Sequence, residues 1–144
     1  MKKIFLGLLL LVSFLGFSQK VKMKKNSIFI DDIEVYKFQD EGSMKFFSTI
    51  SGVEFVSIVE TSYEVINPVY NSTYSSSSRY LKYYIRTIKF LKSGKELTTD
   101  IAVKQIASSI YKSEMVNENG KIDEEKLDIF INKYNNENLK YKIN

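Results

Sequence analysis

Residues 80–100 read YLKYYIRTIKFL, KSGK and ELTTD, and this stretch decides the fold. Seven of its first twelve residues are aromatic or β-branched, a composition that favours a pleated strand over a helix. Two sets of residues alternate with a period of two: Leu81, Tyr83, Ile85 and Thr87 against Tyr80, Lys82, Tyr84 and Arg86. Gly94 can adopt the positive φ of a tight turn. The stretch therefore predicts a long strand, a turn at Ser93-Gly94 and a short return strand that leads into a helix.

A helix is the competing interpretation of the same residues. Five apolar positions have helical spacing: Leu81, Tyr84, Ile85, Ile88 and Leu91. The period of two also breaks after residue 87, because Ile88 and Phe90 fall on the face that was polar before. A bulge, or a strand end covered on both sides, would produce that break. We favour the strand and expect three of its residues to face the core: Leu81, Tyr83 and Ile85.

The first nineteen residues, MKKIFLGLLLLVSFLGFSQ, have the organisation of an export signal. Two lysines precede an apolar run, and Gly16-Phe17-Ser18 offers small residues at the positions that a signal peptidase reads. We expect cleavage after Ser18, so that residues 1–18 are a signal peptide and residues 19–144 form one domain. The apolar run is short for a membrane span, which needs about 20 residues. A retained N-terminal anchor is the alternative, whereas the absence of cysteine excludes a bacterial lipoprotein attachment.

The charge of the chain is modest and mixed. Loss of residues 1–18 would remove two of the 21 basic residues and no acid, leaving 19 against 17 acids and a net charge of +2. The charges are interspersed, and a nucleic-acid-binding surface would need a clustered basic face. Without cysteine no disulfide can stabilise the chain, so its stability must come from an apolar core. We expect an exported protein, periplasmic or secreted, with no nucleic-acid partner and no membrane span after cleavage.

Short strands precede two helices in the rest of the chain. Strand patterns separated by turn residues occupy residues 27–30, 34–38, 44–50 and 53–60, and the last of these continues to residue 66 after an irregularity at Thr61-Ser62. One amphipathic helix follows, with its apolar face at Val103, Ile106, Ala107, Ile110 and Tyr111 and with Thr99 or Asp100 as its cap. Asp123 caps a second helix, whose apolar face is Leu127, Phe130, Ile131 and Tyr134. The chain ends in one more strand or an ordered tail. This order predicts an α+β fold, a mostly antiparallel sheet with two C-terminal helices packed on one face.

Histidine and cysteine are both absent, which removes a large part of enzyme chemistry. Ser-His-Asp and Cys-His nucleophiles, imidazole proton shuttles and nearly all zinc sites need one of these residues. No glycine-rich phosphate loop is present, so nucleotide binding is unsupported. We expect no cofactor and no metal, and we expect the protein not to be an enzyme.

Two weaker chemical interpretations remain open in the sequence. A pair of acids can cleave a glycosidic bond without other residues, and the candidates are Asp31, Asp32, Asp40 and Glu41. All four lie at turns, where acids are common for backbone reasons. Residues 115–126 resemble a calcium loop, but Met115 and Lys126 stand where the first ligand and the bidentate acid would be needed. An ordinary Asn119-Gly120 turn before a capped helix explains the same residues.

One surface has the composition of a recognition site. Residues 67–79, NPVYNSTYSSSSR, form an exposed loop of low complexity beside the outer face of the long strand. Tyrosine offers a stiff, amphipathic contact surface, and serine and asparagine offer adaptable hydrogen bonds. We predict that five residues converge there to bind a ligand: Tyr70, Tyr74, Tyr80, Tyr84 and Arg86. The plainer alternative is that the tyrosines cover a sheet edge and the serines form a slack loop.

Four segments together carry a resemblance: MKKIFLGLLLLVSFLGFSQ, SIFIDDIEVYKF, IKFLKSGKELTTD and IAVKQIASSIYKS with NGKIDEEKLDIFINKY. They resemble small exported proteins of unknown function from flavobacteria-type bacteria. The resemblance is one of layout and has no catalytic motif. It implies export and an α+β domain, and nothing about a ligand.

These observations favour an exported, non-enzymatic envelope protein that binds a protein, peptide or glycan through its Tyr/Ser-rich face. The alternative is a structural or assembly component that pairs with another chain through sheet edges. A carboxylate-pair hydrolase is the weakest of the three. The sequence leaves the oligomeric state and the identity of the partner open.

Overall fold

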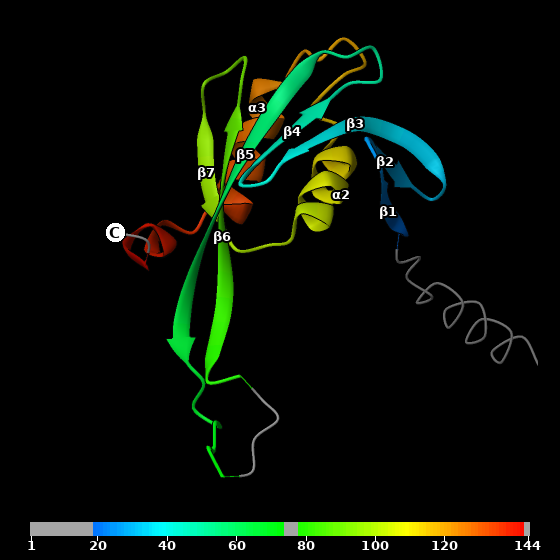
Figure 1. Ribbon diagram of the computed structural model, residues 1–144. Coiled ribbons are helices and arrows are strands. Elements are labelled where there is room, and N and C mark those ends of the chain that lie inside the picture. Colours follow the sequence, from blue (N-terminus) through cyan, green and yellow to red (C-terminus); the bar gives the residue numbers. More distant parts are fainter. Residues whose placement is uncertain (1–18, 74–77, 143–144) are drawn as a thin grey trace, which may run out of the picture.

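A computed structural model describes residues 19–73 and 78–142, so the predicted signal peptide and Tyr74 lie outside the described residues. Seven antiparallel strands form one sheet in which sequence order is also spatial order. The strands are β1 (Val21–Lys24), β2 (Ser27–Ile30), β3 (Ile33–Glu41), β4 (Met44–Ser48), β5 (Glu54–Ile66), β6 (Tyr80–Phe90) and β7 (Glu96–Thr99). Each strand pairs with the next through a short connection, except for the longer loop between β5 and β6 (Figure 1).

Two α-helices and a 3-10 helix complete the chain: α2 (Val103–Ser113), α3 (Glu124–Tyr134) and η1 (Glu137–Lys142). The buried faces of α2 and α3 join the same core as the sheet, and Phe90 of β6 meets Phe130 of α3 edge to face at 6.0 Å. The predicted class is therefore confirmed: a mostly antiparallel sheet with two C-terminal helices packed on one face. The end of the chain forms η1 rather than a further strand.

The helix starts follow the predicted chemistry only in part. Asp123 caps α3, because its carboxylate accepts hydrogen bonds from the backbone N–H groups of Glu125 and Lys126. The prediction that Thr99 or Asp100 caps α2 is wrong. That helix begins after Ala102, whose backbone N–H donates to the Gln105 side chain at 3.1 Å. The Thr99 hydroxyl is used one turn earlier, where it accepts from the N–H of Ile101.

A glycine fixes the α2–α3 connection against the sheet. Gly120 has φ 72°, and a Cβ at this position would lie 2.7 Å from Cγ1 of Val53. A side chain would clash at that distance. Because Gly120 has none, the predicted Asn119-Gly120 turn can pack directly on the β4–β5 turn. This contact brings residues that are distant in sequence together at one end of the sheet.

Residues Tyr80–Phe90 form the strand β6, as predicted, and the helix alternative for this stretch is wrong. β5 and β6 pair without a register shift from Val56↔Phe90 to Ile66↔Tyr80. Neither the bulge nor the irregularity at Thr61-Ser62 occurs. The strand is, however, covered on both sides near its root, because Ile85 is buried on one face and Ile88 on the other. The alternation breaks because the strand changes surroundings. The face that is polar at residues 80–86 becomes the helix-covered face at Ile88 and Phe90, both fully buried.

The long hairpin extends beyond its neighbours as a two-stranded ribbon. β4 pairs with β5 only as far as Val59, and β7 pairs with β6 only as far as Arg86. Past these points, the two strands pair only with each other among the described residues. We call residues 61–73 and 78–85 the arm, and the rest of the described chain the body. Figure 1 shows the arm running away from the helix-covered body in green.

The prediction that Leu81, Tyr83 and Ile85 all face the core is correct only at Ile85. Ile85 is 1% exposed, Leu81 is half-buried and Tyr83 is 45% exposed. The difference follows from the position of each residue along the ribbon. Ile85 lies at the root, directly next to Arg86, the last residue that β7 pairs with, whereas Tyr83 lies two residues further along the arm.

Candidate interaction surface

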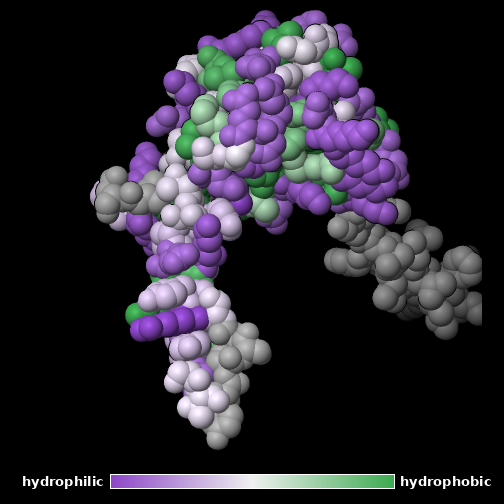
Figure 2. Space-filling view, viewed as in Figure 1, coloured by the Kyte–Doolittle hydropathy of each residue, from purple (hydrophilic) through white to green (hydrophobic). Residues whose placement is uncertain are grey.

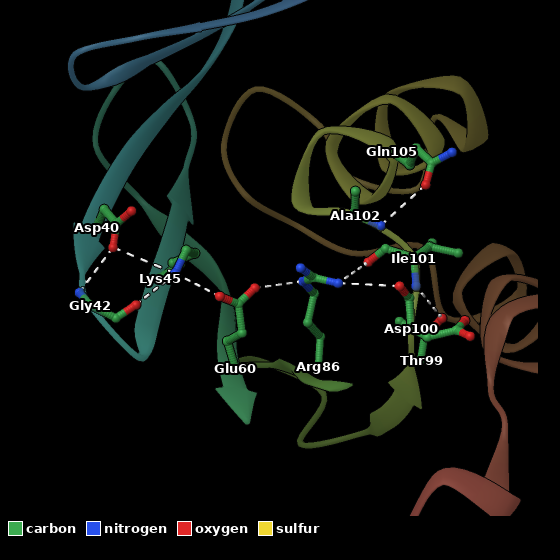
Figure 3. A network of polar contacts seen from close by, with 10 residues as sticks. All are labelled: Asp40, Gly42, Lys45, Glu60, Arg86, Thr99, Asp100, Ile101, Ala102 and Gln105. Atoms are coloured by element: carbon green, nitrogen blue, oxygen red, sulfur yellow. Dashed lines mark hydrogen bonds and ion pairs between the residues drawn. The ribbon is translucent and has the colours of Figure 1, made fainter. Parts of the chain in front are cut away.

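A chain of ion pairs holds the root of the arm to the body (Figure 3). Arg86 Nε of β6 lies 2.7 Å from a Glu60 carboxylate oxygen of β5, and Lys45 of β4 lies 3.7 Å from the other oxygen. Asp40 of β3 lies 3.6 Å from the same Lys45 ammonium group. The side chains of Arg86 and Glu60 are 12% and 19% exposed, so this pair is shielded from most of the solvent. Four neighbouring strands are thus joined where the arm begins.

The same arginine connects the sheet to the first turn of the helical layer. Arg86 Nη1 donates to the backbone carbonyls of Asp100 and Ile101 at 3.2 and 3.0 Å. Its guanidinium group therefore has three hydrogen-bonding partners within the fold. Of the four predicted ligand-binding residues that the structure describes, Arg86 is the one whose side-chain polar atoms the fold already uses. It positions the arm.

Two of the predicted tyrosines stand on the helix-side face of the arm. Tyr80 and Tyr84 are 45% and 42% exposed. The Tyr84 ring lies between two cations, with Lys82 Nζ at 5.5 Å and Arg86 Cζ at 5.7 Å from its centroid. Such contacts each contribute about 0.5–1 kcal/mol at exposed sites. This face therefore combines aromatic area with charges of both signs, because Glu64 is the cross-strand partner of Lys82 and Glu60 that of Arg86.

The opposite face of the arm carries a second aromatic group. Tyr63 and Tyr83 are cross-strand partners whose rings stack at 5.5 Å with an interplanar angle of 21°. Lys142 of η1 reaches the Tyr63 ring, with Nζ 5.5 Å from the centroid and 3.4 Å from the hydroxyl oxygen. Val65 adds exposed aliphatic surface to this face.

Sequence reasoning missed Tyr63 and Tyr83 as surface residues because it assigned Tyr83 to the core. A signal was present in the composition. Six of the ten tyrosines lie between residues 63 and 84, and no phenylalanine does. Tyrosine in place of phenylalanine is typical of positions where one end of the ring stays wet.

A buried asparagine closes the base of the loop at the far end of the arm. The Asn67 N–H donates to the Arg79 carbonyl at 2.9 Å, and its side-chain amide donates to the Ser78 carbonyl at 3.0 Å. Its side-chain oxygen accepts from the N–H of Val69. Val69 and Tyr70 are both exposed next to these hydrogen bonds of Asn67. The structure thus places Tyr70 and Tyr80 at the same end of the arm, while Tyr74 lies outside the described residues.

The arm carries several exposed apolar side chains. Besides Tyr80 and Tyr84, these are Val65, Ile66 and Tyr83 on β5 and β6, and Val69 and Tyr70 in the loop. A two-stranded ribbon without a covered face is marginally stable in water. Figure 2 shows the arm as mostly pale residues of intermediate hydropathy, unlike the purple and green surface of the body. A long projecting ribbon with exposed apolar and aromatic side chains is a surface suited to contact with another molecule.

The acids considered for hydrolysis hold turns of the sheet. Asp31 accepts from the N–H of Lys20 at 3.0 Å, and Asp32 pairs with the Lys22 ammonium group. Both aspartates have positive φ in the β2–β3 turn. Asp40 accepts from the N–H of Gly42 in the next turn. The carboxylates of Asp31 and Asp40 therefore bind backbone N–H groups, as acids at turns commonly do. Asp32 instead forms a side-chain ion pair, and Glu41 accepts from the side-chain amide of Gln39.

The calcium-like segment is also explained by its own hydrogen bonds. The Asn117 side-chain oxygen accepts from the N–H groups of Asn119 and Lys121 at 3.0 and 2.9 Å. An oxygen engaged in two such bonds is poorly placed to bind a cation. Within residues 19–73 and 78–142, no group of three or more acids could hold a metal ion.

A hollow of about 580 Å³ lies between β3, the β4–β5 turn and the α2–α3 connection. Tyr36 and Tyr111 meet edge to face at 6.4 Å along it. Burial, with a smaller effect of Tyr111, raises the pKa of the Tyr36 phenol above its ordinary range. Hydrogen bonds from Lys37 and Ser27 hold the pKa of Glu34 below its ordinary value. The hollow is thus shaped mainly by apolar and aromatic side chains, and its Glu34 carboxylate already has partners.

Comparison of the chain with protein-family models, with curated proteins and with solved structures finds no significant match. Among the described residues, no helix has the length and apolar character needed to cross a bilayer.

Proposed function

We propose that this chain is an exported, non-enzymatic binding protein that engages a protein partner through the arm. The observation that carries the proposal is the projection of a tyrosine-rich ribbon beyond every neighbouring strand of the described sheet. The signal-like segment at residues 1–18 supports export. The absence of histidine and cysteine supports a role without nucleophilic catalysis.

The arrangement of the rings favours a protein over a glycan. Sugars are recognised on open aromatic faces, whereas cations lie over the Tyr84 and Tyr63 rings. The neighbouring Val65, Ile66 and Val69 are aliphatic and exposed, which suits the apolar centre of a protein interface. Tyrosine and arginine are also the side chains that most often dominate binding energy at such interfaces.

Site-specific photo-crosslinking in the native envelope tests the proposal. A photoreactive amino acid is placed at Tyr80 or Tyr83 on the arm and, as a control, at the exposed Tyr141 of η1. We expect the arm positions to capture one protein that the control does not capture. The purified partner should then bind Tyr80→Ala/Tyr83→Ala at least tenfold more weakly than the unmodified chain or Tyr141→Ala.

Two results would overturn the proposal. One is equal capture at Tyr141 and the arm; the other is unchanged affinity of the double variant while its circular dichroism and melting temperature stay normal. Arm-dependent binding to an immobilised glycan, without a protein partner, would replace the proposed partner class.

The free edges of the arm favour a second candidate, assembly through strand pairing. Residues 61–66 and 80–85 have no neighbouring strand on their outer sides within the described sheet. Such edges can pair with another chain. We expect this function to show as a concentration-dependent mass in sedimentation experiments. Replacing residues 64–82 by an Asn-Gly turn keeps the body and shortens the ribbon. The shortened protein should sediment with the mass of a monomer at all concentrations.

A further inference from the structure

A pocket of about 320 Å³ lies on the helical layer, far along the chain from the arm. Its walls come from α2 and α3: Ser109, Lys112, Ser113, Lys126, Ile129, Phe130, Lys133 and Tyr134. The volume is at the lower end of the range seen for small-molecule sites, about 300–1,000 Å³. The pocket is therefore large enough for a small ligand.

Three ammonium groups line this pocket and no carboxylate does. Lys126 has a partner in Glu114, whose carboxylate oxygen lies 4.0 Å from Nζ and is mostly solvent-exposed. Lys133 Nζ lies 5.1 Å from the centroid of the Tyr134 ring. Like charges gathered on one concave surface raise the local positive potential, which an anion would relieve. The Ser113 hydroxyl already donates to the Ile110 carbonyl at 2.7 Å, so the lysine ammonium groups are the donors that such an anion would meet.

The surroundings of the Tyr134 phenol have the same positive character. Its phenol pKa lies below the ordinary value, because the Ser109 hydroxyl hydrogen-bonds to the phenol and the ammonium groups of Lys133 and Lys112 lie near. The surroundings that favour a phenolate also favour an anionic ligand at this position.

The remainder of the lining is apolar. Phe130 is almost completely buried and packs against the Tyr134 ring with centroids 4.7 Å apart. Ile129, by contrast, is 62% exposed beside the pocket, on the outer side of α3. A ligand that placed only a charged group here would leave this apolar surface in water. One that also carried an apolar chain or ring would cover it.

We propose that the pocket between α2 and α3 binds a small amphiphilic anion, a phosphate, sulfate or carboxylate group joined to a short apolar chain or ring. Lys112 and Lys133 hold the anionic group, and Ile129, Phe130 and the Tyr134 ring cover the apolar part. The site is independent of the arm and of the protein partner proposed for it.

Calorimetric titration with octyl phosphate tests the site, using the chain from Gln19 onward, which contains the whole sheet and both helices. Inorganic phosphate supplies the charge alone, and octyl glucoside supplies the chain alone. We expect octyl phosphate to bind at least tenfold more tightly than either, with an affinity that falls as salt is added. Vesicles of phosphatidylcholine with and without phosphatidylglycerol distinguish a lipid headgroup from a free ligand.

Matched variants place the binding in this pocket. Lys112→Gln/Lys133→Gln should weaken octyl phosphate at least tenfold, whereas Lys89→Gln/Lys140→Gln, with the same loss of charge, should not. Ile129→Ser should weaken octyl phosphate and leave inorganic phosphate unchanged. Lys112, Lys133 and Ile129 are exposed, so the fold should survive, which circular dichroism verifies.

Equal affinity of both double-lysine variants would overturn the proposal, as would octyl glucoside binding as tightly as octyl phosphate. Tight binding to phosphatidylglycerol vesicles that requires Lys112 and Lys133 would support the site and identify a lipid as the source of the anion.

Discussion

The two halves of the β5–β6 hairpin have the same antiparallel backbone pairing, but one half is buried in the body and the other is exposed to solvent. In the body half, Phe55, Ile58, Ile88 and Phe90 are fully buried. In the arm half, Tyr80, Tyr83 and Tyr84 are each more than 40% exposed. The pairing register runs through both halves without interruption. Strand formation and burial are therefore separate properties of these residues.

The choice between phenylalanine and tyrosine follows this division. Phenylalanine has no polar atom and is stable where packing is complete, as between Phe47 and Phe55. Tyrosine keeps its hydroxyl in water while its ring covers the ribbon, which suits an element without a core of its own. The difference shows that aromatic residues in one strand can serve stability at one end and contact at the other.

The network at Glu60 and Arg86 marks the boundary between the halves (Figure 3). Before it, each strand has two neighbours; after it, each has one. A shielded, geometrically specific ion pair fixes the direction in which the ribbon leaves the sheet. The arm is thus held at its base by these polar contacts together with the buried Ile85 side chain.

The largest difference between the halves should appear when one aromatic ring is removed from each. Phe55→Ala should lower the free energy of unfolding by about 3–5 kcal/mol, because it leaves a cavity in a close-packed core. Tyr83→Ala should lower it by only about 0.5–1.5 kcal/mol, the contribution of a stacked pair beyond its burial. Urea denaturation of both variants measures this. Similar losses would mean that the arm belongs to the same cooperative core as the body.

Disrupting the ion pair between Glu60 and Arg86 should lower the free energy of unfolding by an intermediate amount. Arg86→Gln leaves the Glu60 carboxylate without its 2.7 Å partner and two backbone carbonyls without a donor. We expect a loss of about 2–3 kcal/mol, the usual contribution of hydrogen bonds to charged groups. Amide hydrogen exchange at residues 61–66 and 80–85 should also accelerate.

Arg79→Gln, near the far end of the arm, is the control for this variant. It removes the same charge without touching the network and should change the stability by less than about 0.5 kcal/mol. An Arg86→Gln protein as stable as Arg79→Gln would show that the ion-pair chain does not anchor the arm.

The smallest expected change in the free energy of unfolding occurs only at alkaline pH. It tests whether Tyr36 behaves as a buried core residue of the body. The pKa of Tyr36 is raised by burial, so above about pH 10 its phenol loses a proton in the unfolded chain before the folded one. The unfolded state then binds fewer protons, and stability falls as pH rises, by up to about 1.4 kcal/mol per pH unit. Below pH 10 the contribution is fully present.

Tyr36→Phe should remove this alkaline decline and leave the stability near pH 7 within about 1 kcal/mol. Urea denaturation at intervals from pH 7 to 11 measures both. An equally steep decline in the variant would assign the alkaline sensitivity to other groups.

Local patterns in the sequence determined most of the elements, but β1 and η1 were not predicted. The period of two and the β-branched content were enough for β6, since a pleated strand is set by adjacent residues. Asp123 and the apolar spacing behind it were enough for α3, because a cap and a helical face lie within a few turns. The element order then implied the α+β class.

The candidate surfaces were accessible from the sequence only in part. Tyr70, Tyr80 and Tyr84 stood out by composition, and the structure places them exposed at the arm. The role of Arg86 at the root depends on Glu60 and two distant carbonyls, contacts that no local pattern specifies. The convergence of Lys112, Lys126 and Lys133 likewise depends on how α2 and α3 pack.

Sequence alone thus determined that residues 80–90 form a strand, and tertiary structure decided what that strand does. The face that is polar at Tyr84 is core at Ile88 because α2 and α3 cover the body and do not reach the arm. Tyr83 is exposed because β4 and β7 end before it. Burial depends on where neighbouring elements stop, and this is a property of the whole chain rather than of the strand itself.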